Sequence, residues 1–283
     1  MEKIGLLIDS TSLTREDIQK TSFLKVASLK VRIDEKEFNE IDISYEQMNQ
    51  HLKTAKKLLT SQPSPGEFLD LYKSFWSEGY THILVITLSE KLSGTFQSAL
   101  IAKSMLDFPL EIRVYAPQTA SFGVALGIPK IIQSIEQGLS FDTLMDRVHK
   151  LYEHPTVMFT LSNLMHLFRG GRLNLVSAFL GTVLRIKPIV EMIHGKLELT
   201  RKERTNIACF EYFTAKIDEY VKNYQHVYVD FIDLNHPEWA TRFQDYMKEK
   251  HPQVECHFTH QITPVFSVHL GDQGFGIAVL SEN

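Results

Sequence analysis

Short apolar runs alternate with capped helical segments through the first half of this 283-residue chain. The run Ile4 to Ile8 predicts a strand, and Thr14-Arg15-Glu16-Asp17 after it is typical of a capped helix start. Ser64-Pro65-Gly66-Glu67 places a capping serine, a first-turn proline and a reciprocating glutamate ahead of an apolar helix face. Alternation of this kind predicts a parallel sheet covered by helices on both faces.

Two further strand and helix units follow. His82 to Leu88 predicts a buried strand, and Ser93-Gly94-Thr95 leads into a helix. Glu111 to Ala116 predicts the next strand, and Ser121-Phe122-Gly123 opens a long apolar helix. Because proline lacks an amide hydrogen, we expect this helix to kink or restart at Pro129.

The regular alternation of strand and helix signals ends at about residue 155. Ser162 to Arg169 predicts a short helix closed by Gly170-Gly171, and Leu175 to Ile186 predicts a helix that is apolar almost all round. His194-Gly195, between two strand-like segments, indicates a hairpin. The other expected elements are helices at Glu211 to Asn223 and Glu238 to Lys250, and strands at Val227 to Asp233, Val254 to Phe258, Val265 to Leu270 and Phe275 to Leu280. We therefore predict an α/β domain over residues 1–155 and an α+β domain with a mixed sheet over residues 156–283.

Composition excludes several classes of protein. With 43% hydrophobic and 23% charged residues the chain can bury a core, and disorder is not expected. Its longest apolar runs fall far short of the ~20 residues of a membrane helix, and the start of the sequence lacks a signal-peptide pattern. Cys209 and Cys256 provide neither a disulfide framework nor a paired metal knuckle. We expect a cytoplasmic protein.

Charge is concentrated in one segment. Residues 169–204 carry eight basic and three acidic side chains, a local charge of +5 against −4 for the whole chain. Such a segment suits an anionic ligand group, an acidic partner or a membrane surface. A merely solvated basic face explains it equally well.

The common catalytic motifs are absent from the sequence. There is no phosphate-binding Gly-x-x-x-x-Gly-Lys loop and no His-Glu-x-x-His, and Ser121 has Thr119 where a nucleophile elbow needs glycine. Three hydroxyl-rich loops remain: Thr60-Ser61-Gln62, Ser93-Gly94-Thr95 and Thr119-Ala120-Ser121. Hydroxyls and free helix amides at strand ends can bind a carboxylate or phosphate, although each hydroxyl could simply cap its own helix.

Five segments, in this order, resemble the DegV family. They are Thr60-Ser61-Gln62-Pro63-Ser64-Pro65, Leu92-Ser93-Gly94-Thr95-Phe96-Gln97-Ser98-Ala99, Gly170-Gly171-Arg172, Ile186-Lys187-Pro188-Ile189 and His269-Leu270-Gly271. The resemblance runs from Asp9-Ser10 to the last strand and implies two α/β domains with a long-chain fatty acid between them. It also implies the role of such proteins in Firmicutes, where they are the fatty-acid-binding subunit of fatty acid kinase. That subunit presents the carboxylate to a separate ATP-using subunit, which makes acyl phosphate for phospholipid metabolism.

The resemblance places the fatty-acid carboxylate near Thr60 and Ser93, with His269 and Arg204 completing the polar network. The implied binding set is Thr60, Ser61, Ser93, Gly94, Thr95, Ser121, Arg204 and His269. Hydroxyls donate to the carboxylate, His269 orients them, Arg204 supplies a cationic fork and Gly94 allows close backbone approach. Arg172 and Lys187 also match family motifs, and we assign them to structure or partner docking. We expect no intrinsic catalysis, no metal and no cofactor besides the bound fatty acid.

Two positions depart from the family pattern. Ala116-Pro117 stands where the family usually has Asp-Ser, and Asp272-Gln273 stands where it usually has Pro-Gly. Both concern the expected mouth of the pocket, so they affect acyl selectivity and loop shape more than binding itself.

Burial of about fifteen methylenes at ~0.8 kcal/mol each contributes roughly 12 kcal/mol before ordering costs, which is enough for tight retention. The apolar segment Leu175 to Ile186 is either a tunnel wall or lid, or a plain core helix.

An alternative function is a serine-dependent acyl hydrolase or transferase that uses Ser93 or Ser121 with His269, although no carboxylate partner for the base is identifiable. A nucleic-acid surface over residues 169–204 is the weakest alternative, and we expect no nucleic-acid partner; transient contact with a membrane surface fits the same charge.

Overall fold

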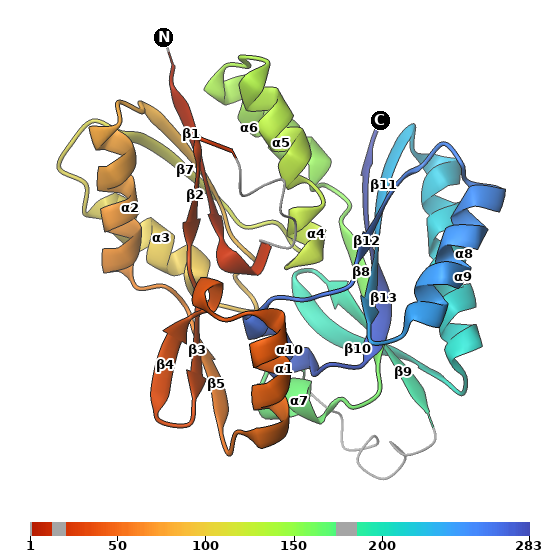
Figure 1. Ribbon diagram of the computed structural model, residues 1–283. Helices are drawn as coiled ribbons and strands as arrows, with labels where there is room; N and C mark the ends of the chain where they lie inside the picture. Colours follow the sequence, from red (N-terminus) through yellow and green to blue (C-terminus); the bar gives the residue numbers. More distant parts are fainter. Residues whose placement is uncertain (1, 13–20, 174–185) are drawn as a thin grey trace.

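The computed structural model describes residues 2–12, 21–173 and 186–283, and in that part of the chain it contains three β-sheets (Figure 1). The first is a sheet of four strands in the order β2-β1-β6-β7, all paired in parallel. Its strands are β1 (Ile4–Asp9), β2 (Leu24–Ala27), β6 (His82–Ile86) and β7 (Glu111–Tyr115). The predicted parallel sheet is confirmed.

Helices cover both faces of this parallel sheet. α2 (Pro65–Ser77) and α3 (Thr95–Ser104) lie on one face, and α4 (Phe122–Ala125), α5 (Ile128–Glu136) and α6 (Phe141–Leu151) lie on the other (Figure 1). Successive strand residues alternate between the two layers, since Leu7 packs with Phe75 of α2 whereas Leu6 packs with Leu144 of α6. The two inner strands, β1 and β6, are buried on both faces, so they appear in the sequence as continuous apolar runs.

Helix boundaries follow the predicted signals. The Ser64 hydroxyl oxygen accepts a hydrogen bond from the Glu67 amide, and the Glu67 carboxylate accepts one from the Ser64 amide. Together these two bonds form the predicted capping box. The apolar helix after Ser121 does restart at Pro129, which occupies the first turn of α5.

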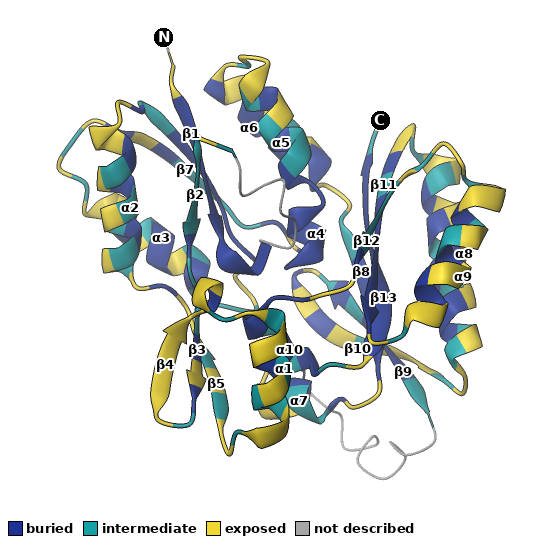
Figure 2. Ribbon diagram, in the orientation of Figure 1, coloured by how far each residue is buried: buried dark blue, intermediate teal, exposed yellow. Residues whose placement is uncertain are grey.

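The sequence prediction omits β2, α6, the strand over residues 156–161, one further helix and a small antiparallel sheet. The sheet has the order β4-β3-β5 and consists of β3 (Lys30–Ile33), β4 (Lys36–Asn39) and β5 (Leu58–Ser61). α1 (Tyr45–Thr54) connects β4 to β5 and packs through Met48 into the same small core. Strands of four residues, with β4 exposed throughout, leave almost no apolar periodicity to detect (Figure 2).

The third sheet is mixed and has six strands in the order β10-β9-β8-β13-β11-β12. It consists of β8 (Thr156–Leu161), β9 (Lys187–Ile193), β10 (Lys196–Glu203), β11 (His226–Leu234), β12 (Glu255–Thr259) and β13 (Gly274–Glu282). β11 and β12 pair in parallel and the other neighbours are antiparallel. His194 and Gly195, both at positive φ, form the predicted hairpin turn between β9 and β10.

α8 (Asn206–Asn223) and α9 (Pro237–Lys250) cover the outer face of the mixed sheet (Figure 1). The inner face packs against the layer α4 to α6, so Phe159 and Ala278 share one apolar core with Leu6 and Phe122. The α4 to α6 layer therefore lies between the two large sheets. None of the helices in the described part of the chain is long and apolar enough to cross a membrane.

The predicted strand Val265 to Leu270 is wrong, because the structure forms helix α10 (Pro264–Leu270) there. Thr263 is extended, as expected before proline, and Pro264 takes the first helical position. Val265 and Val268, three residues apart, then share one helix face against Leu29 and Met48 of the small core. Burial against another element outweighs the strand preference of the two valines.

Other predictions have mixed outcomes. The helix predicted from Ser162 is α7 (Met165–Arg169), which begins three residues later and ends at Gly170 as predicted. The helix start at Thr14 to Asp17 and the apolar helix at Leu175 to Ile186 lie outside the described residues, apart from Ile186 itself. The domain boundary after residue 155 stays a prediction; α10, from the second half of the chain, packs on α1 and β5 of the first.

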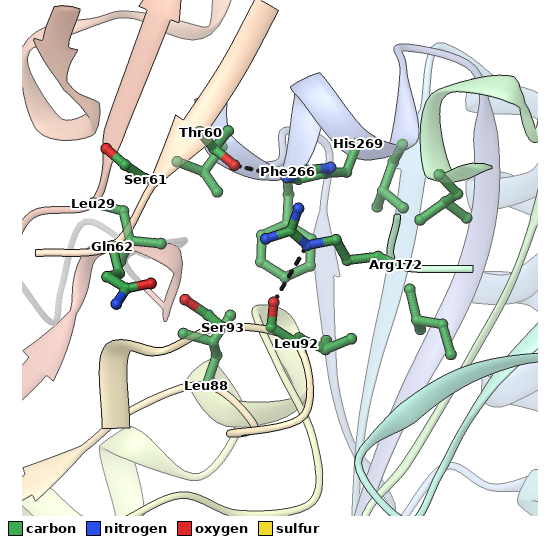
Figure 3. A pocket seen from close by; sticks show the side chains of 14 residues that line it. Leu29, Thr60, Ser61, Gln62, Leu88, Leu92, Ser93, Arg172, Phe266 and His269 are labelled. Carbon is green, nitrogen blue, oxygen red and sulfur yellow. Dashed lines mark hydrogen bonds between the residues drawn. The ribbon is translucent and has the colours of Figure 1, made fainter. Parts of the chain in front are cut away.

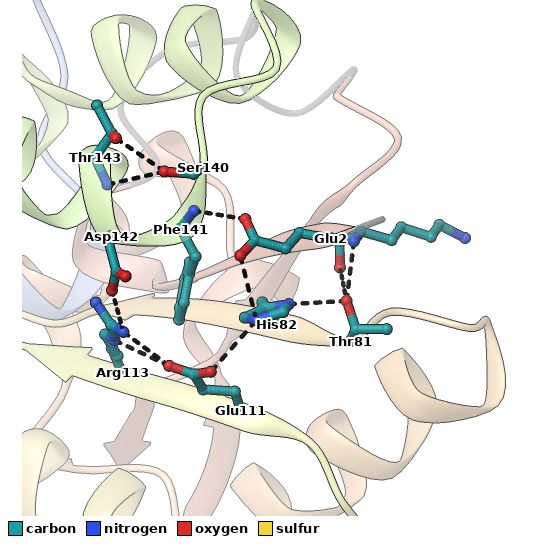
Figure 4. Close-up of polar contacts among 10 residues, drawn as sticks. Glu2, Thr81, His82, Glu111, Arg113, Ser140, Phe141, Asp142 and Thr143 are labelled. Atoms are coloured by element: carbon teal, nitrogen blue, oxygen red, sulfur yellow. Dashed lines mark hydrogen bonds and ion pairs between the residues drawn. The ribbon is translucent and has the colours of Figure 1, made fainter.

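A polar network ties α6 to the amino-terminal edge of the parallel sheet (Figure 4). The Phe141 amide, at the start of α6, donates to the Glu2 carboxylate at 2.7 Å. Arg113 of β7 bridges Asp142 at 2.5 Å and Glu111 at 2.9 Å. These contacts hold the helix layer at the amino-terminal ends of the strands. The carboxyl-terminal ends of the strands lie on the opposite side of the sheet, away from this network.

Candidate functional site

One cavity lies where the ends of β5 and β6 meet α10 and the turn after α7 (Figure 3). The space between its atoms, counted together with the opening to solvent, is about 550 Å³. Both halves of the chain contribute to its wall. Its polar lining residues are Thr60, Ser61, Gln62, Ser93, Arg172 and His269.

Thr60 and His269 meet in this cavity. Thr60 is the third residue of β5 and pairs with Val31 of β3, while His269 lies in the last turn of α10. The Thr60 Oγ1 and His269 Nε2 atoms are 2.9 Å apart and share a hydrogen bond (Figure 3). The structure thus joins the small sheet to α10 through two residues that the sequence analysis places in the site.

His269 is a neutral imidazole at physiological pH. Burial lowers its pKa to about 4, and the nearby positive charge of Arg172 acts in the same direction. Its second ring nitrogen, Nδ1, is buried and has no hydrogen-bond partner among the described residues. Gly170 packs directly on this nitrogen, since a Cβ built at Gly170 would lie 2.4 Å from it.

Ser93 approaches the cavity from the loop between β6 and α3. Its Oγ lies 2.9 Å from Oγ1 of the buried Thr95, the first residue of α3. Gly94, at the helix N-cap, has no side chain to satisfy the first amides of α3. The Gln62 side chain lies against Gly94, where a Cβ would meet it at 2.5 Å. A glycine therefore lets the two hydroxyl loops approach each other closely.

Arg172, which we assign from the sequence to structure or partner docking, also lines the cavity. Its side chain enters the cavity, where Nη1 donates to the Gly170 carbonyl at 2.6 Å and Nε to the Leu92 carbonyl at 3.3 Å (Figure 3). Burial lowers its pKa, but an arginine stays charged at any physiological pH. The Gly-Gly-Arg motif was the signal in the sequence; its place in the cavity depends on how the turn after α7 folds back.

Apolar side chains make up the rest of the cavity wall. They are Leu29, Leu88, Leu92, Leu167, Leu197, Val265, Phe266 and Leu270. These residues come from the loop between β2 and β3, the loop after β6, α7, β10 and α10. The cavity wall therefore combines six polar and eight apolar side chains.

The remaining residues of the predicted set lie elsewhere or at the edge. Ser61 lines the cavity but is exposed. Ser121 is fully buried, and its backbone has a strained φ of 51° and ψ of −122° between β7 and α4. Its hydroxyl does not line the cavity and has no partner among the described residues. Arg204 is exposed in the turn between β10 and α8 and is likewise absent from the cavity wall.

This arrangement suits an amphipathic acid. Hydroxyls and one fixed guanidinium can hold an anionic head, and the neutral imidazole can accept or donate a single hydrogen bond. The described residues include no group of three or more His, Cys, Asp or Glu side chains that could hold a metal ion. Fold and cavity together define an α/β protein whose candidate site, open to solvent, is lined by both polar and apolar side chains.

The chain belongs to the DegV family. The family model described as "Uncharacterised protein, DegV family" matches residues 3–282, which confirms the resemblance inferred from the motifs. A DegV domain-containing protein of Staphylococcus aureus is 27% identical over 283 residues, which is 100% of both chains. Another from Listeria innocua is 28% identical over 98% of both chains.

Solved structures show the same fold. A DegV family protein from Thermus thermophilus, described for its fatty acid binding, is 27% identical, covers 99% of each chain and has a TM-score of 0.89. DegV from Bacillus subtilis, described as a fatty acid binding protein, is 25% identical over 100% of each chain with a TM-score of 0.88. The predicted architecture, a parallel-sheet N-terminal part and a mixed-sheet C-terminal part, is therefore confirmed.

Proposed function

We propose that this protein binds one long-chain fatty acid in the cavity and holds its carboxylate among Thr60, Ser93, Arg172 and His269. The observation that carries the proposal is the hydrogen bond of 2.9 Å between Thr60 and His269, in a cavity that Arg172 and eight apolar side chains also line. Relatives that cover the whole chain are described as fatty acid binding proteins, which supports the same ligand.

Each polar residue has its own part in this proposal. Arg172 balances the charge of the carboxylate, because His269 is neutral and cannot do so. Thr60 and Ser93 donate hydroxyl hydrogen bonds, and His269 fixes the orientation of the Thr60 hydroxyl. The amides at the start of α3 add a favourable dipole.

The other members of the predicted set act less directly. Thr95 supports Ser93 through their hydroxyl contact, and Gly94 gives Gln62 room beside the headgroup. Ser61 lies at the opening. Ser121 supports the wall, and we assign exposed Arg204 to contact with a partner, since the cavity already contains Arg172.

Delivery of the headgroup to a second protein is the next step of the proposal. The protein itself supplies no catalysis: it presents the bound carboxylate to an ATP-dependent fatty acid kinase subunit in the cytoplasm, which forms the acyl phosphate. The exposed basic residues of the segment 169–204 provide a docking face for this subunit or a transient contact with an anionic membrane; among the described residues they are Arg169, Lys196, Arg201, Lys202 and Arg204.

The test of ligand identity is mass spectrometry of lipid extracted from the purified protein. We expect long-chain fatty acid in the wild type and in Leu69→Trp, a change on α2 outside the cavity. Leu92→Trp places a larger side chain in the cavity, so this variant should contain no fatty acid. Wild-type protein that stays empty even after incubation with excess fatty acid would refute the proposal.

The presentation step has a separate test. Protein loaded with radiolabelled fatty acid is mixed with the kinase subunit and ATP, and acyl phosphate is trapped as the hydroxamate. Loaded wild type should turn over and Ser93→Ala should not. Turnover by the loaded protein and ATP without the kinase subunit would contradict a binding role.

A serine hydrolase is the alternative function, and the geometry favours it less. His269 Nε2 is bonded to Thr60, and Ser93 is bonded to Thr95, so neither serine of the alternative is paired with the base. The Ser121 backbone has the strained strand-to-helix turn of a nucleophile, but its hydroxyl is buried away from the cavity. Ester hydrolysis by the isolated protein, lost in Ser93→Ala or Ser121→Ala, would favour this alternative.

A further inference from the structure

A buried carboxylate lies behind the cavity wall, outside the set of residues that face the ligand. Glu40 begins the short 3-10 helix Glu40–Asp42 after β4 and is only 2% exposed. Its Oε1 accepts the amide hydrogen of Val265, in the first turn of α10, at 2.8 Å. The first amides of a helix have no partner within the helix, so Glu40 supplies one from a distant segment.

The same carboxylate is also tied to the segment before β3, which contributes Leu29 to the cavity wall. The Ser10 hydroxyl donates to Glu40 Oε2, and the Ser10 Oγ accepts the Leu29 amide at 2.8 Å. The Glu40 amide also donates to the Leu29 carbonyl at 2.8 Å. Leu29 lines the cavity, so Glu40 sets the distance between this wall and α10.

α10 carries both chemical ends of the site. Val265 and His269 are one helical turn apart, about 6 Å along the axis, and Phe266 lies between them on the cavity wall. A helix this short cannot absorb a displacement at its first turn before it reaches its last. The position of Val265 therefore determines where the His269 imidazole lies.

We infer that Glu40 is a positioning residue which, through its hydrogen bond to the Val265 amide, holds α10 so that His269 meets Thr60 and the carboxylate site is assembled. The inference rests on the proposed function. In this view, Glu40 makes the site prefer an acid headgroup over an alcohol, although Glu40 itself does not contact the ligand. Burial raises the pKa of Glu40 to about 7, so the carboxyl is held in its place at an electrostatic cost, which fits a functional role.

Three substitutions separate reach, charge and hydrogen bonding. Glu40→Gln keeps the side-chain length and an acceptor for the Val265 amide. Glu40→Asp keeps the carboxylate but shortens it by one methylene, and Glu40→Ala removes both. Asp230→Asn is the matched control, because Asp230 is an equally buried carboxyl in β11 that accepts from Thr259 and lies away from the cavity.

The first readout is the ratio of dissociation constants for hexadecanol and palmitate, which share a tail and differ in the headgroup. We expect the preference for palmitate to fall about tenfold in Glu40→Asp and Glu40→Ala. It should stay within about threefold of the wild type in Glu40→Gln and in the control. A purely structural role would weaken both ligands equally and leave the ratio unchanged.

The second readout needs no ligand. NMR titration of the His269 ring should give a low pKa in the wild type and in Glu40→Gln. The pKa should rise toward its ordinary value in Glu40→Asp and Glu40→Ala, as the ring leaves its buried place. If Glu40→Ala does not fold, Glu40→Asp and Ser10→Ala take its place.

Folded Asp and Ala variants with an unchanged headgroup ratio and an unchanged His269 titration would overturn the inference. A wild type that bound hexadecanol as tightly as palmitate would instead refute the proposed function, and the ring titration would still decide the role of Glu40.

Discussion

The Thr60 hydroxyl lies 2.9 Å from Nε2 of His269, although the two residues are 209 positions apart in the chain. One belongs to a strand of the small antiparallel sheet and the other to the last turn of α10. Their contact lies in the cavity, so residues from both halves of the chain form its wall.

Removal of the Thr60 hydroxyl should weaken fatty-acid binding. In Thr60→Val the shape is kept, but His269 and the carboxylate lose a hydrogen-bond partner, so we expect affinity to fall about tenfold. Titration calorimetry with palmitate measures this. Thr241→Val, an exposed threonine on α9 bonded to its own helix, is the control and should bind as the wild type. Equal affinity in both variants would remove Thr60 from the site.

A methyl group at Gly170 should displace His269. The Cβ of Gly170→Ala would lie 2.4 Å from His269 Nδ1, closer than such atoms can approach, so the ring must shift away from Thr60. We expect at least a severalfold loss of palmitate affinity with the fold retained by circular dichroism. Gly66→Ala is the control, since its Cβ would meet only the Ser64 Oγ at 3.8 Å. Full affinity in Gly170→Ala would show that the ring position does not matter.

The charge of Arg172 should matter only for acids. Arg172→Gln leaves a buried carboxylate without its cation, so palmitate affinity should fall by more than tenfold while hexadecanol affinity changes little. Arg201→Gln removes a charge from the same basic segment, where Arg201 lies over the Tyr212 ring at 4.2 Å outside the cavity. That control should keep palmitate affinity. Parallel losses for acid and alcohol in Arg172→Gln would point to a packing role instead.

His269 should make stability depend on pH. Its folded pKa of about 4 lies below the ordinary 6.5, so the unfolded chain binds more protons between these values. Relative to His269→Gln, the wild type should lose about 3 kcal/mol of unfolding free energy as the pH falls from 6.5 to 4. Urea denaturation at several pH values measures the difference. His226→Gln removes an exposed histidine and controls for the substitution itself. A constant difference between wild type and His269→Gln would contradict the buried, neutral imidazole.

Elements whose boundaries depend on neighbouring residues could be predicted from the sequence. The Ser64 capping box and the His194-Gly195 turn depend on neighbouring residues, so each was predicted at its place. Val265 to Leu270 was misassigned because two valines favour a strand, whereas the site of burial against Met48 is set by a distant helix.

The site was predictable only where motif and geometry coincide. Thr60, Ser93 and His269 were named from the family motifs, and all three line the cavity. The sequence does not distinguish Arg172 from Arg204, because both lie in one basic segment and only the folded turn at Gly170 brings Arg172 to the cavity. Glu40 gave no signal, because an isolated glutamate among charged neighbours reads as solvated surface.

The packing of α10 on the small sheet also has a consequence for biosynthesis. The ribosome makes β5 long before it makes His269, 209 residues later than Thr60. A nascent polypeptide that has already folded its parallel sheet offers no closed container for lipid. Under the proposed function, fatty acid therefore enters after translation, and a chain stalled before α10 should leave the ribosome without bound lipid.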